Sequence, residues 1–313
     1  MFGRHQGSIP LFRFAGVDVF LHWSWFLVAV FEINSRVGKY SSIAWNVLEY
    51  LALFLLVLLH EYGHALACKN VGGIATRIVL WPLGGLAYVD PPPRPGATLW
   101  SIAAGPLVNV VFFPIFFILF VIIQSLGWAK SVPNAYQLVL AVTVINMVLL
   151  VFNLLPIYPL DGGQILRSLL WFVLGKARSL MAATLIGFLG VVGLIVFAFR
   201  AGSVWFGVMS LFIVLNCWAG LKQSIVMLRL TKLPRRDGFA CPWCKAAPPL
   251  GNYWTCGACR TIFDIFETQA ICPYCATEFT PASCIDCGKP HLLSNWIVPA
   301  LSTPQPQLQS RLP

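Results

Sequence analysis

Charged residues are scarce in this sequence, and their scarcity excludes a soluble globular protein. Asp, Glu, Lys and Arg together make up 10% of the 313 residues, whereas hydrophobic residues make up 58%. An average soluble domain carries about 25% charged residues. The sequence also lacks an opening apolar stretch with a small-residue cleavage site, so we expect no removable signal peptide. This composition predicts an integral membrane protein.

Apolar runs long enough to cross a bilayer recur along the chain up to residue 221. A transmembrane helix needs roughly 20 consecutive, mostly apolar residues. We therefore predict an all-α polytopic membrane bundle with about six transmembrane helices. The six segments are residues 17–33, 44–67, 98–123, 135–155, 180–199 and 203–221.

The basic residues indicate orientation rather than affinity for nucleic acid. The formal net charge is +10, but in a membrane protein Lys and Arg gather in the cytoplasmic loops. With six spans and a cytoplasmic N-terminus, thirteen basic residues fall inside and only Arg36, Lys39, Lys130 and Arg200 fall outside. We expect a multi-pass protein of the cell membrane, with both termini in the cytoplasm and a bacterial inner membrane as its setting.

Cysteine pairs appear where the apolar runs stop, after residue 236. Two Cys₄ zinc sites need eight thiolates, and a cytosolic location argues against disulfides. The spacing leaves the pairing open: adjacent pairs could share a site in sequence order, or the two middle pairs could form an inner site within an outer one. We predict a double zinc ribbon that holds two structural zinc ions. Its pairs are Cys241/Cys244, Cys256/Cys259, Cys272/Cys275 and Cys284/Cys287.

The chain is thus predicted to have three parts: a membrane core at 1–232, the double zinc ribbon at 237–290 and a disordered tail at 291–313. The tail is rich in Pro, Gln and Ser and cannot bury enough apolar surface to fold alone. Structural stability is the simplest role for the ribbons. Their basic residues are scattered, so a regulatory protein or a substrate tail fits them better as a partner than nucleic acid.

The run "HEYGH" at residues 60–64 lies inside the second predicted span. Residues i and i+4 share one face of a helix, so His60 and His64 can bind one Zn²⁺ while Glu61 reaches a water beside it as general base. In a soluble sequence such a motif is often a coincidence. Here chance is a weak explanation, because a charged side chain near mid-bilayer costs roughly 2.5 kcal/mol or more.

A catalytic zinc site usually has three protein ligands, so a third ligand must be found. The extended motif HExxHxxGxxH is excluded, because Ala67 and Asn70 stand at its Gly and His positions. Outside the Cys-rich region, two carboxylates follow the motif. Asp90 lies in a loop that we expect to be solvent-exposed, and Asp161 lies between apolar segments. The second and fourth spans cross the membrane in the same direction, so the motif and Asp161 lie near the same membrane face. This shared position favours Asp161 as the third ligand.

With these motifs the chain resembles the site-2 proteases, intramembrane zinc metalloproteases, and in particular their six-span bacterial sporulation branch. The resemblance extends over about residues 10–225. A Cys-rich module after the last span is a departure from those relatives. The matching motifs are "HEYGH" at 60–64, "AAGPLVN" at 103–109 and "NLLPIYPLDGG" at 153–163, with softer agreement at "FLHWSW" (20–25) and "WPLGGLA" (81–87).

The resemblance implies a zinc-dependent endopeptidase that hydrolyses peptide bonds within or near transmembrane segments of membrane proteins. It implies zinc ligation by His60, His64 and Asp161, with Glu61 activating water. Asn109 and Asn153 fall at motif positions suggested to contact the substrate or polarise its carbonyl, although intramembrane Asn often only links helices. One catalytic zinc ion would then accompany the two structural ones.

The segment "IVLWPLGGLAYV" at 78–89 is too short to span the bilayer. Gly84 and Gly85 suggest a re-entrant hairpin whose edge could pair with an unwound substrate strand, or a purely structural loop. Two other classes of protein are alternatives for the whole chain. A zinc-binding transporter would show paired halves, and none is visible. A catalytically silent adaptor would not need Glu61 together with all three ligands.

Overall fold

The computed structural model describes residues 7–36, 38–81, 84–279 and 281–298. The chain divides into two units, Met1–Ile225 and Val226–Pro313, which are described separately.

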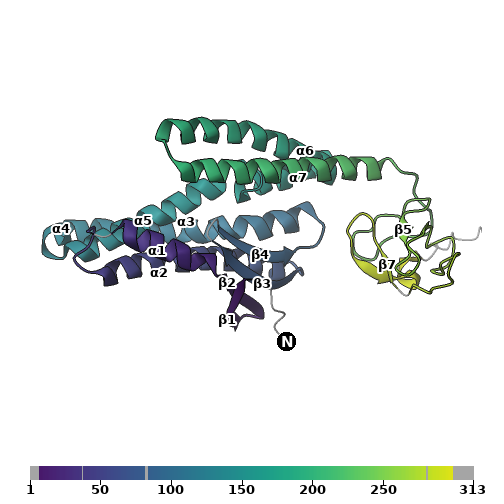
Figure 1. The fold of residues 1–313 in the computed structure, drawn as a ribbon, viewed down its shortest axis with the longest axis horizontal. Helices are drawn as coiled ribbons and strands as arrows, with labels where there is room; N and C mark the ends of the chain where they lie inside the picture. The colour runs from purple at the N-terminus through teal and green to yellow at the C-terminus, as the bar shows by residue number, and fades with distance from the viewer. Residues whose placement is uncertain (1–6, 37, 82–83, 280, 299–313) are drawn as a thin grey trace, which may run out of the picture. The chain divides into compact units, whose positions relative to one another are not determined.

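Five helices among the described residues are long and apolar enough to cross a membrane. They form the predicted polytopic helical bundle (Figure 1). The fourth of them changes direction at Gly175, whose φ of 77° is not helical. The five are α2 (Ile43–Asn70), α3 (Pro95–Ser125), α5 (Pro133–Leu154), α6 (Asp161–Ala201) and α7 (Val204–Thr231).

The first predicted span, residues 17–33, is not one helix, and this part of the prediction is wrong. Its residues form strand β2 (Val17–His22) and then helix α1 (Ser24–Ser35). The 12 residues of α1 extend only about 18 Å at 1.5 Å per residue, less than the roughly 30 Å of a bilayer core. A hydropathy window cannot distinguish an apolar strand followed by a short helix from one long helix.

Strand β2 and helix α1 together run the length of α2. At one end β2 pairs in parallel with β3 (Ile74–Trp81), which follows the C-terminus of α2. At the other end Asn46, near the start of α2, donates hydrogen bonds to the backbone oxygens of Ile33 and Arg36 at the end of α1. The chain therefore lies beside both ends of α2 before α2 begins.

A buried carboxylate fixes the turn between α1 and α2. Glu49 is 3% exposed and accepts hydrogen bonds from Lys39 Nζ at 2.9 Å and Tyr40 Oη at 2.6 Å. Arg36 forms a salt bridge with the same carboxylate. The charge of Glu49 is thus compensated, as a buried acid requires.

A four-stranded sheet packs against the second half of α2 (Figure 1). Its order is β1-β2-β3-β4, with β1 at Ser8–Phe14 and β4 at Gly84–Asp90. Strands β3 and β4 form an antiparallel hairpin in which Trp81 pairs with Gly84 and Leu80 with Gly85. This is the hairpin expected at 78–89; residues 82 and 83 lie outside the described residues.

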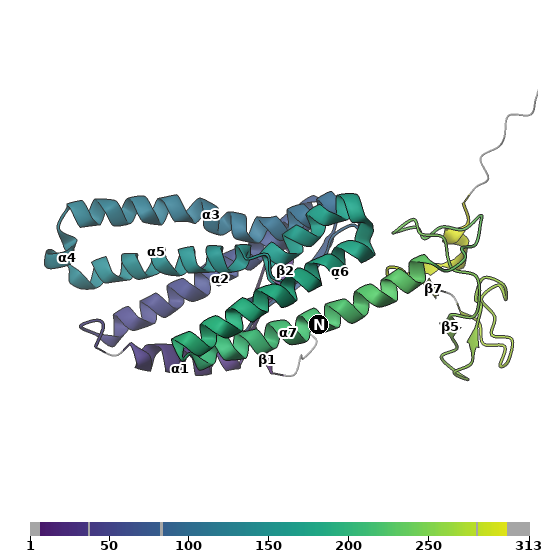
Figure 2. The same cartoon turned by 90° about the horizontal axis from the view of Figure 1, so that it is seen from above.

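Helix α3 is central to the bundle and packs against α2, α5 and α6. Figure 2 shows α3 and α5 running side by side, with the short helix α4 (Trp128–Ser131) at their connection. Gly63 of α2 permits the closest approach, since a Cβ there would lie 2.6 Å from the backbone oxygen of Ala104. This approach brings the α2 histidines to the face of α3.

The C-terminal unit contains two short hairpins around an aromatic core. Phe266 lies edge-on to Trp254 and to Trp296, with ring centroids 5.2 and 5.1 Å apart. The hairpins are β5 (Trp254–Thr255) with β6 (Ile262–Phe263), and β7 (Pro281–Ser283) with β8 (Pro290–Leu292), followed by the 3₁₀ turn Leu293–Trp296.

The predicted start of a disordered tail at 291 is therefore too early. Trp296 is 1% exposed, and the backbone N–H of Ala240 donates to its carbonyl oxygen. Composition alone missed this because a single buried tryptophan is enough to anchor a polar segment. Residues 299–313 of the predicted tail lie outside the described residues.

Candidate active site and cysteine clusters

Three polar side chains lie buried on one face of α2. His60, Glu61 and His64 are 5%, 6% and 7% exposed, respectively. The Nε2 atoms of His60 and His64 are 3.2 Å apart, as the i, i+4 spacing predicted. These two nitrogens define one point inside the bundle.

Asp161, the first residue of α6, reaches the same point. Its Oδ2 lies 2.9 Å from Nε2 of His60 and 3.3 Å from Nε2 of His64. The rival carboxylate, Asp90, is exposed at the end of β4, where it pairs with Ile74. The structure thus brings Asp161, and not Asp90, to the two histidines.

Each histidine uses its other ring nitrogen to bind a group on α3. Nδ1 of His64 lies 3.0 Å from the backbone oxygen of Ser101, and Nδ1 of His60 lies 2.7 Å from Oδ1 of Asn109. A Cβ at Gly105 would overlap the imidazole of His64, so only glycine fits there. Both rings are consequently held with Nε2 toward Asp161.

The carboxylate of Glu61 faces strand β4. Its Oε2 accepts a hydrogen bond from the backbone N–H of Ala87 at 3.0 Å. A Cβ at Gly85 would overlap this carboxyl group, which explains why glycine is needed at that position. Gly84 lies one residue earlier in β4, and Asn153 is half-buried in the last turn of α5. Substrate contact by these residues stays a prediction.

The donor set of the site suits zinc. Zn²⁺ binds imidazole nitrogen and carboxylate oxygen, and catalytic sites commonly have three protein ligands and one position left for water. Two imidazoles and one carboxylate converge here, and the group His60, Glu61 and His64 has ligand atoms within 4.8 Å of one another. The nitrogens remote from the site are hydrogen-bonded, as is usual for metal-binding histidines.

Sequence reasoning missed two groups in this site. The Ser101 carbonyl is a backbone atom, so the residue type carries no signal of its role. Asn146 of α5 contacts Asn109, and only its place inside an apolar span, where polar residues are costly, could have drawn attention to it.

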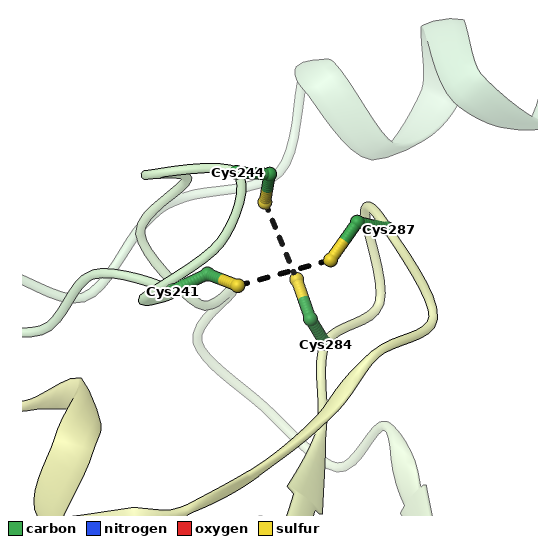
Figure 3. A group of neighbouring side chains, drawn as sticks. All are labelled: Cys241, Cys244, Cys284 and Cys287. Atoms are coloured by element: carbon green, nitrogen blue, oxygen red, sulfur yellow. Dashed lines mark hydrogen bonds between the residues drawn. The ribbon is translucent and has the colours of Figure 1, made fainter. Parts of the chain in front are cut away.

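The eight ribbon cysteines form two clusters, and their pairing is nested. Figure 3 shows the outer cluster, in which the sulfurs of Cys241 and Cys287 are 3.8 Å apart and those of Cys244 and Cys284 are 3.7 Å apart. The inner cluster joins Cys256 with Cys275 and Cys259 with Cys272, each pair with sulfurs 3.6 Å apart. Of the two arrangements that the spacing allowed, the structure shows the nested one.

All four Cys-x-x-Cys pairs adopt the same backbone turn. In each pair, the residue after the second cysteine donates its N–H to the carbonyl oxygen of the first cysteine. The first cysteine donates its own N–H to the carbonyl oxygen of the residue two positions after the second cysteine. The residue after the second cysteine has a positive φ in every case: Lys245, Arg260, Ala276 and Gly288, at 62°, 60°, 56° and 75°. Such turns point both sulfurs of a pair to one point.

In the outer cluster, one thiol is shifted toward the thiolate form that binds metal. The hydrogen bond with Cys284 lowers the pKa of Cys244 to about 5, and the same bond raises the pKa of Cys284. Four sulfurs within reach of one point fit the tetrahedral preference of structural zinc.

These observations define an integral membrane protein with a His-Glu-x-x-His metal centre inside its helices. Residues 49–197 match the family model described as "Peptidase family M50". The membrane unit is similar to this family over that range, in agreement with the resemblance to the site-2 proteases.

Three relatives illustrate the similarity. The chain is 37% identical over 180 residues to a zinc metalloprotease of Methanocaldococcus jannaschii, which covers 58% of this chain and 50% of that protein. It is 35% identical over 121 residues to stage IV sporulation protein FB of Bacillus subtilis, covering 37% of this chain and 38% of that protein. A solved structure, a site-2 protease from Methanocaldococcus jannaschii, is 29% identical with a TM-score of 0.49, covering 68% of this chain and 95% of that chain. The chain thus spans about half the length, or less, of these two curated relatives.

Proposed function

We propose that this protein is a zinc-dependent endopeptidase that hydrolyses peptide bonds within or near the transmembrane segments of other membrane proteins. One observation carries the proposal: His60, His64 and Asp161 converge beside Glu61 inside a helical membrane bundle. The match of residues 49–197 to the M50 family model supports it.

In this proposal His60, His64 and Asp161 hold the zinc ion. Zinc bound there would supply a Lewis acid that polarises a carbonyl and lowers the pKa of water toward about 7. Glu61 takes the proton of the attacking water and passes it to the leaving nitrogen. The hydrogen bond from the N–H of Ala87 to Oε2 of Glu61 holds the carboxylate that moves the proton.

The substrate reaches this site in an extended form. A helix in a bilayer has its carbonyls hydrogen-bonded within itself, so the segment must unwind before a carbonyl can be attacked. Strand β4 lies beside Glu61, and we assign Gly84 and Gly85 to the strand that receives the substrate. Asn153, eight residues before Asp161 in the sequence, is assigned to contact it.

The two cysteine clusters hold one structural zinc ion each, which makes three zinc ions per chain. The bias of basic residues supports a cytoplasmic location of both termini and of the ribbons, and a bacterial inner membrane as the setting. A regulatory protein or a substrate tail is the proposed partner of the ribbons.

The test is cleavage of a co-expressed membrane substrate by the wild type and by Glu61→Gln. This substitution keeps the size of the side chain and all three ligands but removes the base, so we expect cleavage to fall by at least about 100-fold, in line with general-base contributions. Zinc content should stay unchanged. Equal cleavage by both forms would contradict the proposed function and would favour an adaptor or a transporter.

A further inference from the structure

The buried amides of Asn109 and Asn146 form a closed pair behind His60. Both residues are 0% exposed. Asn109 Nδ2 donates to Asn146 Oδ1 at 2.9 Å, and Asn146 Nδ2 donates to the backbone oxygen of Asn109 at 3.0 Å. Either hydrogen bond alone would be enough to link α3 and α5. The pair makes both bonds, and its remaining polar atom, Asn109 Oδ1, faces His60.

The backbone carbonyl fixes the direction of every bond in this chain. A carbonyl oxygen only accepts, so Asn146 must turn its NH₂ group toward Asn109 O and its Oδ1 toward the Asn109 side chain. Asn109 must then present its NH₂ group to that oxygen and its own Oδ1 to His60. Nδ1 of His60 therefore carries a proton. In the neutral imidazole the lone pair then lies on Nε2, the atom 2.9 Å from Asp161.

The two histidines of the site differ in how much support they need. Nδ1 of His64 faces the carbonyl of Ser101, an acceptor that cannot reverse its polarity. Nδ1 of His60 faces an amide side chain, which would present a donor if it rotated by half a turn. A second residue is needed to prevent that rotation, and Asn146 is placed to do it.

We propose that Asn109 and Asn146 are positioning residues that hold His60 in its Nδ1–H tautomer, ready to bind zinc through Nε2. This inference rests on the proposed metal site. Asn109 acts directly on His60, whereas Asn146 acts only through Asn109. Their complete burial favours this role over substrate contact for Asn109.

The experiment measures zinc affinity in the full-length chain by competition with a chelator. Zinc retained by a His60→Ala/His64→Ala variant is subtracted, because it belongs to the cysteine clusters. The test variants are Asn109→Leu and Asn146→Leu, and Asn109→Asp is the conservative variant that keeps an acceptor for His60. Thr143→Val is the matched control: Thr143 is buried in α5 and contacts Phe116 of α3 but not His60.

We expect Asn109→Leu and Asn146→Leu to weaken zinc binding by roughly 10- to 100-fold, the usual cost of losing an outer partner of a metal ligand. Asn109→Asp should retain most of the affinity, and Thr143→Val should match the wild type. Thermal unfolding in detergent, measured on every variant, separates loss of the fold from loss of zinc.

Zinc affinity that is unchanged in Asn146→Leu, or that falls equally in Thr143→Val, would overturn the inference and leave the pair as helix packing. Because the measurement is zinc retention rather than cleavage, its outcome is independent of the Glu61→Gln test. A chain that binds zinc as expected but cleaves nothing would refute the proposed function alone.

Discussion

At the scale of single residues, the site combines groups that a bilayer normally excludes. His60, Glu61 and His64 are each less than a tenth exposed. The carboxylate of Asp161 contacts the imidazoles of His60 and His64. Burying such groups is costly unless they are paired or bind a metal. Their mutual contacts therefore account for their presence in apolar helices.

The choice between the two carboxylates is directly testable. Asp161→Ala removes the oxygen that lies 2.9 Å from His60, so zinc binding and cleavage should fall by roughly 100-fold or more. Loss of a residue that only hydrogen-bonds to a metal ligand costs up to about 100-fold, and loss of a ligand itself should cost at least as much. Asp90→Ala, at the exposed end of β4, should keep most of the activity. Cleavage of a co-expressed membrane substrate is the measurement. The opposite ranking would mean that Asp161 is not the third ligand.

The spacing of His60 and His64 made the metal motif predictable, because i, i+4 geometry is local. Asp161 was reached by elimination, because only two carboxylates outside the Cys-rich region follow the motif. The role of Asn146 could not be predicted from the sequence. It depends on two hydrogen bonds to Asn109, 37 positions away, and no local pattern encodes them.

At the scale of elements, the cysteine turns depend on one unusual backbone conformation. An L-residue in the left-handed region costs roughly 1–2 kcal/mol, and three of the four turns place a non-glycine residue there. Gly288 is the exception. The strain is accepted because the turn points two sulfurs to one point.

Gly288→Ala should therefore weaken zinc binding by the outer cluster by about tenfold, the equivalent of 1.4 kcal/mol. A Cβ at Gly288 meets no atom within 4 Å, so the effect would report backbone strain alone. Ala276→Gly, at the matching position of the inner cluster, should leave affinity unchanged or raise it, because relief of strain offsets the greater freedom of the unfolded chain. Zinc release to a chelator measures both. Equal effects of the two substitutions would contradict this explanation.

The elements also show where hydropathy is insufficient. The apolar windows located α2, α3, α5, α6 and α7, because each is a long run with few charges. They missed the division between β2 and α1, and the pairing of β2 with β3, which depends on residues more than 50 positions apart. Long-range strand pairing leaves no periodic signal in a short apolar stretch.

At the scale of the whole molecule, the arginines that follow α7 form their contacts with the C-terminal unit. Arg235 binds Asp286 through two hydrogen bonds and also donates to the carbonyl of Leu230. Arg236 pairs with Asp264, which is 2% exposed. A clean separation of the two parts must therefore leave both arginines with the C-terminal unit.

Truncation after Lys232 should preserve the membrane zinc site, because its ligands all lie in the first unit. We expect the truncated chain to lose more cleavage of a natural substrate than of a short artificial span, since the ribbons are proposed to recognise substrate tails. The measurement is the ratio of the two cleavage rates at matched expression levels. If a folded core loses both activities equally, the ribbons take part in the chemistry itself.

The nested pairing of the cysteines has a consequence for the order in which the ribbons assemble. The inner cluster joins Cys259 to Cys272, 13 positions apart, whereas the outer joins Cys244 to Cys284, 40 positions apart. Direct closure of the longer loop costs about 1 kcal/mol more in chain entropy. Once the inner loop has closed, it shortens the path between the outer pairs, so metal loading proceeds from the inside outward. Damage to the inner cluster then loosens the outer one, while damage to the outer leaves the inner loop closed.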